Sequence, residues 1–243
     1  MRPFALSVIL LAALIGGGCA HRRTASVPEL PDSGNPAGDQ MLVRYFDVSK
    51  RNVARGVTMA ARFVASLPNM GKQAELEARK TVMPDGVVQY DVVNREGDRT
   101  VQKDVIARYM STEMEKAGEA NQDIAITPQN YRFKFRGQQM RDGREVLVYE
   151  LNPRKKRVGL FKGELWLDAE TGLPLREAGK LVKSPSVFLK DIEFARDYEI
   201  RDGRAYIKAM ESVTQTRFWG PAQLKVEFSD LSWELPPLSG GQH

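Results

Sequence analysis

The stretch GELWLDAETGLPLRE, residues 163–177, consists of two extended segments around a short turn. In the first segment Leu165 and Leu167 alternate with Trp166, which is the period of two expected for a β-strand. The turn, Asp168–Gly172, combines polar residues with a glycine. Because a turn this short joins antiparallel neighbours, the stretch predicts a hairpin in which Trp166 lies opposite the two leucines.

The same alternation continues on both sides of this hairpin. Residues 131–136 alternate aromatic and cationic side chains, and 141–144 and 201–204 both have the sequence Arg-Asp-Gly-Arg. Asp-Gly supplies the positive φ angles of a tight hairpin turn. Three earlier segments are also predicted to be strands: 56–68, 72–83 and 87–94. We therefore expect a strongly curved antiparallel sheet of roughly nine to eleven strands.

Two segments have helical spacing instead. Residues 41–53 predict a short amphipathic helix. A second helix is capped by Asp98 and ends near Gly118. Its apolar stripe consists of Val101, Val105, Ile106, Tyr109, Met110 and Met114. The fold class is therefore α+β, with two helices covering one face of the sheet.

The N-terminal segment predicts export. Residues 4–18 are apolar, follow Arg2 and are shorter than a membrane-spanning helix, so 1–18 is interpreted as a signal peptide. Gly16–Cys19 resembles a bacterial lipobox, with Cys19 as the lipid-modified mature N-terminus, although a glycine stands where that motif usually has leucine. Ordinary cleavage after Ala20 is the alternative. Lipidation also accounts for the single cysteine, which has no partner for a disulfide.

The remaining chain divides into three parts. Residues 19–40 are rich in proline and glycine and predict a flexible linker. Residues 41–236 are expected to form a single domain, and 237–243 a disordered tail. The protein is therefore expected in the cell envelope, anchored by lipid to a membrane, most plausibly the periplasmic side of the outer membrane.

The chain offers few residues for catalysis or metal binding. Its two histidines are His21, in the predicted linker, and His243, the last residue. Neither belongs to a preorganised site, so histidine-dependent nucleophiles and zinc sites are not expected. We expect no enzyme activity, no metal and no cofactor.

The hairpin resembles a known family. Gly163, Trp166, Asp168 and the segment Thr171–Pro174, followed by Arg176, match the pattern G-x-x-W-x-D-x-x-T-G-L-P-x-R of the outer-membrane lipoprotein-sorting family, which includes LolA and LolB. The resemblance extends over residues 41–234. It implies an unclosed β-barrel, with helices over an apolar concave face that accepts acyl chains of lipids or lipoproteins.

Three groups of residues are candidates for such a role. The cavity and lid candidates are Tyr109, Met110, Met114, Phe194 and Phe228. The candidates for a rim that contacts a membrane or a partner are Arg154, Lys155, Lys156, Arg157 and Phe161. The loop candidates are Leu67 and Met70. For each group a structural role is the alternative: a permanent core for the helix, a charged sheet edge for the rim, and an ordinary turn for the loop.

The resulting functional hypothesis is a monomeric, membrane-tethered lipoprotein that binds lipid or lipoprotein acyl chains and takes part in envelope lipid or lipoprotein trafficking. An envelope protein partner is possible in this hypothesis, whereas nucleic acid is not expected for an exported protein. The rival hypothesis is an envelope scaffold or sensor with the same fold, a filled core and a role in protein–protein contacts.

Overall fold

The computed structural model describes residues 31–51, 56–116 and 123–233 of the 243. The predicted signal peptide, Cys19 and the predicted tail lie outside the described residues. The helical segments are α1 (Pro36–Arg51), the 3-10 helix η1 (Pro68–Met70), α2 (Arg99–Val101), the π-helix η2 (Gln102–Ala107) and α3 (Arg108–Lys116). The strands are β1 (Val57–Leu67), β2 (Lys72–Val82), β3 (Val88–Gly97), β4 (Tyr131–Arg141), β5 (Arg144–Pro153), β6 (Phe161–Asp168), β7 (Pro174–Leu181), β8 (Leu189–Arg201), β9 (Arg204–Thr216) and β10 (Gly220–Ser232).

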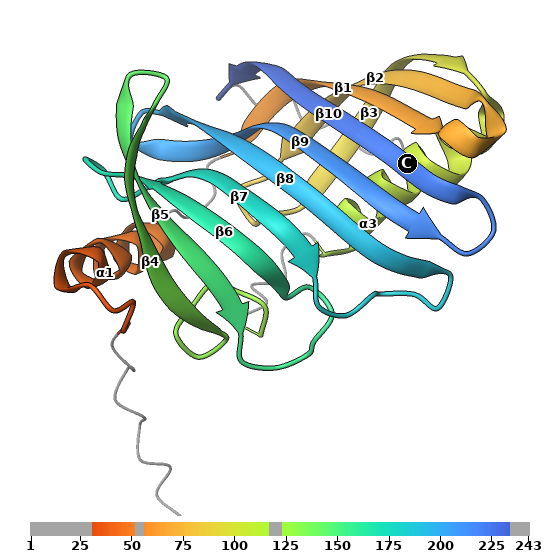
Figure 1. The fold of residues 1–243 in the computed structure, drawn as a ribbon. Coiled ribbons are helices and arrows are strands. Elements are labelled where there is room, and N and C mark those ends of the chain that lie inside the picture. The colour runs from red at the N-terminus through yellow and green to blue at the C-terminus, as the bar shows by residue number, and fades with distance from the viewer. Residues whose placement is uncertain (1–30, 52–55, 117–122, 234–243) are drawn as a thin grey trace, which may run out of the picture.

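These strands form one ten-stranded sheet in the order β3-β2-β1-β10-β9-β8-β7-β6-β5-β4. Every pair of neighbours is antiparallel. β3 and β4 are the two free edges, so the sheet is not closed. The prediction of a curved antiparallel sheet is confirmed, and Figure 1 shows the sheet wrapping around the helices.

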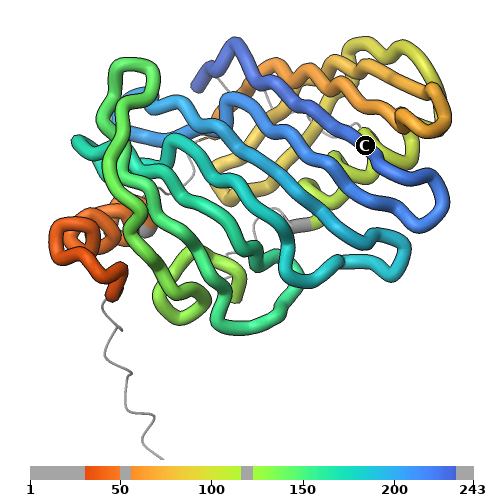
Figure 2. Tube along the Cα trace, viewed as in Figure 1, coloured from red at the N-terminus to blue at the C-terminus, as the bar shows by residue number. Residues whose placement is uncertain are grey.

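One pairing joins the two halves of the chain. β1 lies beside β10, with Phe63 opposite Val226 and Ala65 opposite Leu224. All other neighbouring strands are consecutive in the sequence. The trace in Figure 2 shows the resulting shape, in which the orange and blue strands run side by side.

Close packing between β6 and β7 depends on two glycines. Gly163 and Gly179 lie opposite each other in the strand register. A Cβ atom added to Gly163 would lie 1.9 Å from the carbonyl oxygen of Ala178, and one added to Gly179 would lie 2.4 Å from that of Lys162. Only glycine lets the backbones approach so closely at this point.

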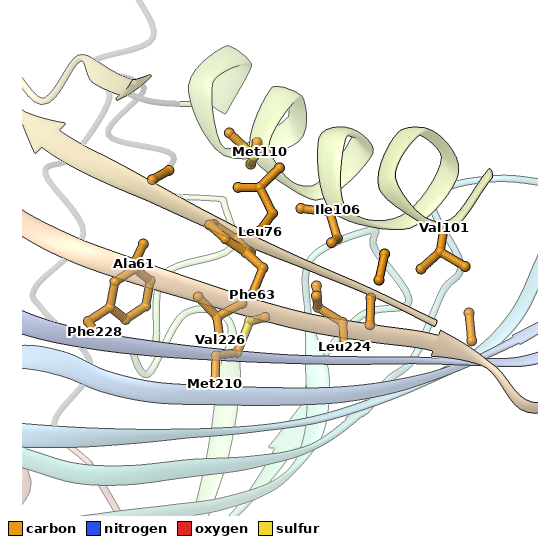
Figure 3. Close-up of a cluster of buried hydrophobic side chains, with 14 of the residues drawn as sticks. Ala61, Phe63, Leu76, Val101, Ile106, Met110, Met210, Leu224, Val226 and Phe228 are labelled. Carbon is orange, nitrogen blue, oxygen red and sulfur yellow. The ribbon is translucent and has the colours of Figure 1, made fainter. Parts of the chain in front are cut away.

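The apolar residues on the helix side of the sheet form two separate clusters. Cluster 1 joins β1, β2 and β10 to the helical segment α2–η2–α3 through the buried residues Phe63, Leu76, Val101, Ile106 and Val226, several of which Figure 3 shows. Cluster 2 joins β4, β5 and β6 to α1 and contains, among others, Leu42, Tyr45, Tyr131, Tyr149 and Leu165. Each helix therefore covers its own part of the concave face.

The helix predicted after Asp98 is confirmed. The Asp98 carboxylate accepts hydrogen bonds from the backbone N–H groups of Thr100 and Val101, as an N-cap should. The other helix begins earlier than expected, at Pro36 instead of in the segment 41–53. Residues before it are already packed, since Ser33 is buried and its carbonyl accepts a hydrogen bond from Phe135 N–H. Part of the predicted linker is therefore structured.

The hairpin of residues 163–177 forms as predicted. Trp166 lies on the outer face, where its indole N–H donates to Glu164, while Leu165 and Leu167 are buried on the inner face. The turn is organised by Asp168, whose carboxylate accepts hydrogen bonds from the backbone N–H and the hydroxyl of Thr171, each at 2.7 Å. It also pairs with Arg144 at 3.0 Å.

Asp168 generates a pH prediction. Burial alone would raise its pKa, but the hydrogen bonds from Thr171 and the pairing with Arg144 outweigh it and lower the pKa below the usual value. Its contribution to stability is therefore complete above about pH 4, the unfolded value, and is lost as pH falls through the lowered folded pKa.

We expect Asp168→Asn to flatten the acid limb of the stability curve. The free energy of unfolding, measured by urea titration, should fall less steeply between about pH 4 and pH 2 in the variant than in the wild type. Asp142→Asn is the control, because that side chain is almost fully exposed and its replacement should change stability by no more than about 0.5 kcal/mol. Equal slopes in Asp168→Asn and the wild type would contradict the assignment.

Candidate functional site

A polar group lies on the sheet between the two apolar clusters. It consists of Glu177 on β7 and Arg196 and Tyr198 on β8, and we call it the polar strip. A guanidinium nitrogen of Arg196 lies 3.4 Å from a carboxylate oxygen of Glu177. The Glu177 side chain is 10% exposed, whereas that of Arg196 is 41% exposed. Arg196 is thus paired and still accessible.

The polar strip lies on the concave face. In the strand register Glu177 lies opposite Leu165, which is buried on the inner face, and opposite Arg196. Arg196 also stacks on the ring of Phe194, which packs against cluster 2. The strip therefore lies on the inner face, at the boundary of the two clusters.

The protonation states follow from this environment. Burial raises the pKa of Tyr198 well above its usual value, and the neighbouring Glu177 raises it further. Burial also raises the pKa of Tyr45. Burial would lower the pKa of Arg196, but Tyr198, Glu177 and Tyr109 outweigh it and the pKa is raised. At neutral pH the strip therefore combines the Arg196 cation, which pairs with the Glu177 carboxylate, and the neutral Tyr198 hydroxyl, which can donate a hydrogen bond.

This arrangement suits an amphiphilic ligand. An apolar chain would lie against cluster 1 or cluster 2, and a polar or anionic head group would meet Arg196 and Tyr198.

The helix α3 is fastened to the sheet by a buried ion pair. Lys80 on β2 is buried, and its ammonium lies 2.7 Å from a carboxylate oxygen of Glu113 on α3. Glu113 also accepts a hydrogen bond from the Tyr90 hydroxyl on β3. The Lys80 ammonium lies 4.9 Å from the ring centroid of Phe228. We call this contact the α3 latch.

The predicted cavity and lid residues do not form one site. Tyr109, Met110 and Phe228 belong to cluster 1. Phe194 packs beside cluster 2, with its ring centroid 5.0 Å from that of Phe161. Met114 is exposed, so the apolar stripe of the helix ends one turn earlier than expected.

The predicted rim separates into exposed cations and a buried ring. Phe161 packs against Tyr131 and is buried in cluster 2, so its ring does not lie on the surface. Lys155 and Lys156 are exposed. Arg154 donates to the carbonyl of Pro128 at 2.7 Å, which fixes the start of the loop.

The remaining cation of that segment, Arg157, pairs with Asp123 at 2.8 Å. The loop candidates also differ from each other, because Leu67 is fully buried whereas Met70 is exposed. Of the two, Met70 alone is positioned for an external contact.

Sequence reasoning missed the polar strip. None of its candidate residues lies in the strip. The next residue after Arg196, Asp197, faces the other way and pairs with Arg141 and Arg176 on the outer face. The overlooked signal was the spacing, since Arg196 stands midway between Phe194 and Tyr198 and therefore shares their face.

The described residues contain neither a metal-ligand cluster nor a membrane-spanning helix. Within residues 31–51, 56–116 and 123–233, no group of three or more histidine, cysteine or acidic side chains is placed to hold a metal ion. Among the same residues, no helix has the length and apolar character needed to cross a bilayer.

The similarity of this chain to known proteins is distant. No protein-family model matches the chain, and no curated protein matches it significantly. The chain is similar to solved structures of LolA-like proteins. One is a LolA superfamily protein from Nitrosomonas europaea, with 10% identity, a TM-score of 0.37, and coverage of 82% of this chain and 94% of that chain.

Two further structures are similar at the same level. A putative outer membrane lipoprotein-sorting protein domain from Vibrio parahaemolyticus has 15% identity, a TM-score of 0.37, and coverage of 83% of this chain and 93% of that one. A chain of the MucA/MucB complex from Pseudomonas aeruginosa has 14% identity and a TM-score of 0.27, with coverage of 83% of this chain and 100% of that one. These similarities are distant, and the fold itself rests on the strand pairing described above.

The α3 latch generates a stability prediction. Glu113→Ala leaves the Lys80 ammonium buried without its carboxylate partner. We expect the free energy of unfolding to fall by about 2–4 kcal/mol, which is less than for a fully buried pair because Glu113 is partly exposed. Urea unfolding measures this loss. The control is Glu115→Ala, an exposed glutamate on the same helix, which should change stability by about 0.5 kcal/mol or less. Equal stabilities of the two variants would contradict the latch.

Proposed function

We propose that the protein is an exported, membrane-tethered lipoprotein that binds one lipid or lipoprotein acyl chain on its concave face and moves or holds it in the cell envelope, without catalysis. The observation that carries this proposal is the polar strip, an accessible Arg196 paired with Glu177 between two apolar clusters on one face. Apolar surface and a charged group at one boundary match the two chemistries of a lipid.

The charged pair on this face favours a bound ligand over a filled core. Holding Arg196 and Glu177 within a largely apolar face costs desolvation free energy that apolar residues would not cost. An anionic head group would recover part of this cost through charge-assisted hydrogen bonds to Arg196. The α3 latch and the packing of α1 hold the two covering helices on either side of this group.

Native mass spectrometry with lipid extraction tests lipid binding. The protein used for this experiment lacks the predicted signal peptide and Cys19. Stoichiometric co-purified lipid, displaced by a fluorescent fatty acid, is expected. Arg196→Gln should weaken binding of the fluorescent fatty acid about tenfold or more, because a charge-assisted hydrogen bond is lost.

The matched control is Arg62→Gln. Arg62 is an exposed arginine paired with Glu75 at 2.7 Å, and its removal should leave the affinity unchanged. A protein that carries no lipid and does not bind the fluorescent fatty acid would rule the proposal out.

The anchor is tested separately in cells. Because lipid attached to Cys19 would hold the protein at the membrane, Cys19→Ala should move it into the soluble fraction after a high-salt wash. Fractionation and immunoblotting measure this, with Ser7→Ala in the signal segment as the control that should stay in the membrane fraction. Retention of Cys19→Ala after the wash would contradict lipid anchoring.

A second candidate function, an envelope scaffold or sensor, is favoured by a different surface. A shallow hollow of about 590 Å³ on the outer face is lined by Met140, Arg141, Glu164, Trp166 and Arg176, among others. The Arg141 guanidinium stacks on the Trp166 ring at 5.2 Å. Among the described residues, its Nη1 atom is buried without a hydrogen-bond partner. Partly buried aromatic and arginine side chains of this kind are typical of protein interfaces.

A further inference from the structure

The hairpin loops fall at two opposite ends of the sheet. Because all strands are antiparallel in the observed order, successive hairpins alternate between the ends. One end carries the loops β1–β2, β5–β6, β7–β8 and β9–β10, which are residues 68–71, 154–160, 182–188 and 217–219. The other end carries the loops 83–87, 142–143, 169–173 and 202–203.

The two sets of loops have opposite charge. The first set contains six cations and no acidic residue, namely Arg154, Lys155, Lys156, Arg157, Lys183 and Arg217. The second contains four acidic residues and no cation, namely Asp85, Asp142, Glu170 and Asp202. Arginines flank the second set, but Arg141, Arg144 and Arg201 are paired with acids there. We call the first set the basic end and the second the acidic end.

Large exposed apolar side chains gather at the basic end. Phe188 is 54% exposed, Phe218 75% and Val187 71%. The two phenylalanine rings lie together, with centroids 5.9 Å apart, although they come from different loops. We call these three residues the aromatic tip. The exposed Met70 belongs to the neighbouring β1–β2 loop, and Figure 2 shows the β1–β2, β9–β10 and β7–β8 loops following one another along this end.

The aromatic tip is held in an ordered loop. The Ser184 hydroxyl donates to the carbonyl of Leu189 at 2.7 Å, and Phe188 N–H donates to the Ser186 hydroxyl at 3.2 Å. Arg217 N–H donates to the carbonyl of Phe188 at 3.0 Å and joins the two loops. These bonds fix a conformation in which both rings remain in water, which costs free energy unless another surface covers them.

We propose that the basic end is a membrane-contact surface, in which the aromatic tip enters the interfacial region of an anionic bilayer while the surrounding lysines and arginines meet lipid phosphates. The charge of the loops argues for this occupant. Arg157 pairs with Asp123, but the hairpin loops of this end have no acidic residue of their own, and their excess of cations complements an anionic lipid surface. The shape of the tip agrees, since protruding aromatic rings rimmed by cations are suited to the bilayer interface. This contact is independent of what the concave face binds.

The test measures partition coefficients on vesicles. The full chain carrying Cys19→Ser is titrated with vesicles of phosphatidylcholine containing about one third phosphatidylglycerol, and binding is measured by flotation. The N-terminal segment can also bind vesicles, but it is the same in every variant and its contribution to the partition free energy adds to that of the loops. The ratio of the partition coefficients of two variants therefore reports on the loops alone. We expect Phe188→Ser/Phe218→Ser to lower the partition coefficient about tenfold or more.

The matched control is Val93→Ser/Met140→Ser, which removes two similarly exposed apolar side chains, 71% and 68%, outside the basic end. It should leave the partition coefficient unchanged. Lys155→Ala/Lys156→Ala should lower binding to anionic vesicles but not to pure phosphatidylcholine, whereas Lys103→Ala/Arg108→Ala, exposed cations on the helical segment, should change neither.

Equal partition coefficients for the parent and Phe188→Ser/Phe218→Ser would overturn the proposal. It would also be overturned by a parent protein that is dimeric in sedimentation and becomes monomeric in that variant, because the aromatic tip would then be covered by a second copy. Circular dichroism confirms that each variant is folded before it is compared.

Discussion

The concave face of an open ten-stranded sheet has to be covered, and the way this chain covers it determines the rest of the structure. A single helix is too narrow for so wide a surface. The chain uses two, each over its own apolar cluster and each fixed separately: α1 by Leu42 and Tyr45, and α3 by the contact of Glu113 with Lys80. Arg196, Glu177 and Tyr198 lie at the boundary between the regions that the two helices cover.

The polar residues of that boundary differ in character from those of the outer face. Outside, Asp197 pairs with two arginines that are about 70% shielded from solvent, and such pairs contribute modestly to stability. Inside, the Glu177 carboxylate is nearly removed from water and relies on Arg196 for compensation. The inner pair is therefore costly for folding alone, which fits a role in recognition.

The sequence predicted the features that depend on local chemistry. The Asp98 cap, the hairpin of residues 163–177 and the strands up to residue 94 follow from turn residues and period, and all are present in the structure. Features set by tertiary contacts were missed. Phe161 follows a run of cations and is nevertheless buried, because the rings of Tyr131 and Phe194 cover it.

The same limit applies to the site and the linker. Met114 continues the helical stripe but extends past the sheet that would bury it. Pro36 starts α1 within a proline-rich stretch because Ser33 and Gly38 pack against β4. The residues that we propose for binding on the concave face come from strands β7 and β8. Both faces of these strands carry charged residues, so alternation alone did not distinguish the inner from the outer ones.

The pairing of β1 with β10 has a consequence for how the chain acquires its structure. Cluster 1 is assembled from β1, β2 and the helical segment, which are made early, and from β10, which is made last. The first half of the chain therefore cannot bury its apolar residues until nearly the whole polypeptide is present. Contacts this distant in sequence slow folding and favour a chain that stays unfolded while it is being synthesised. Such a chain can still be threaded through a translocation channel, which the proposed export would require.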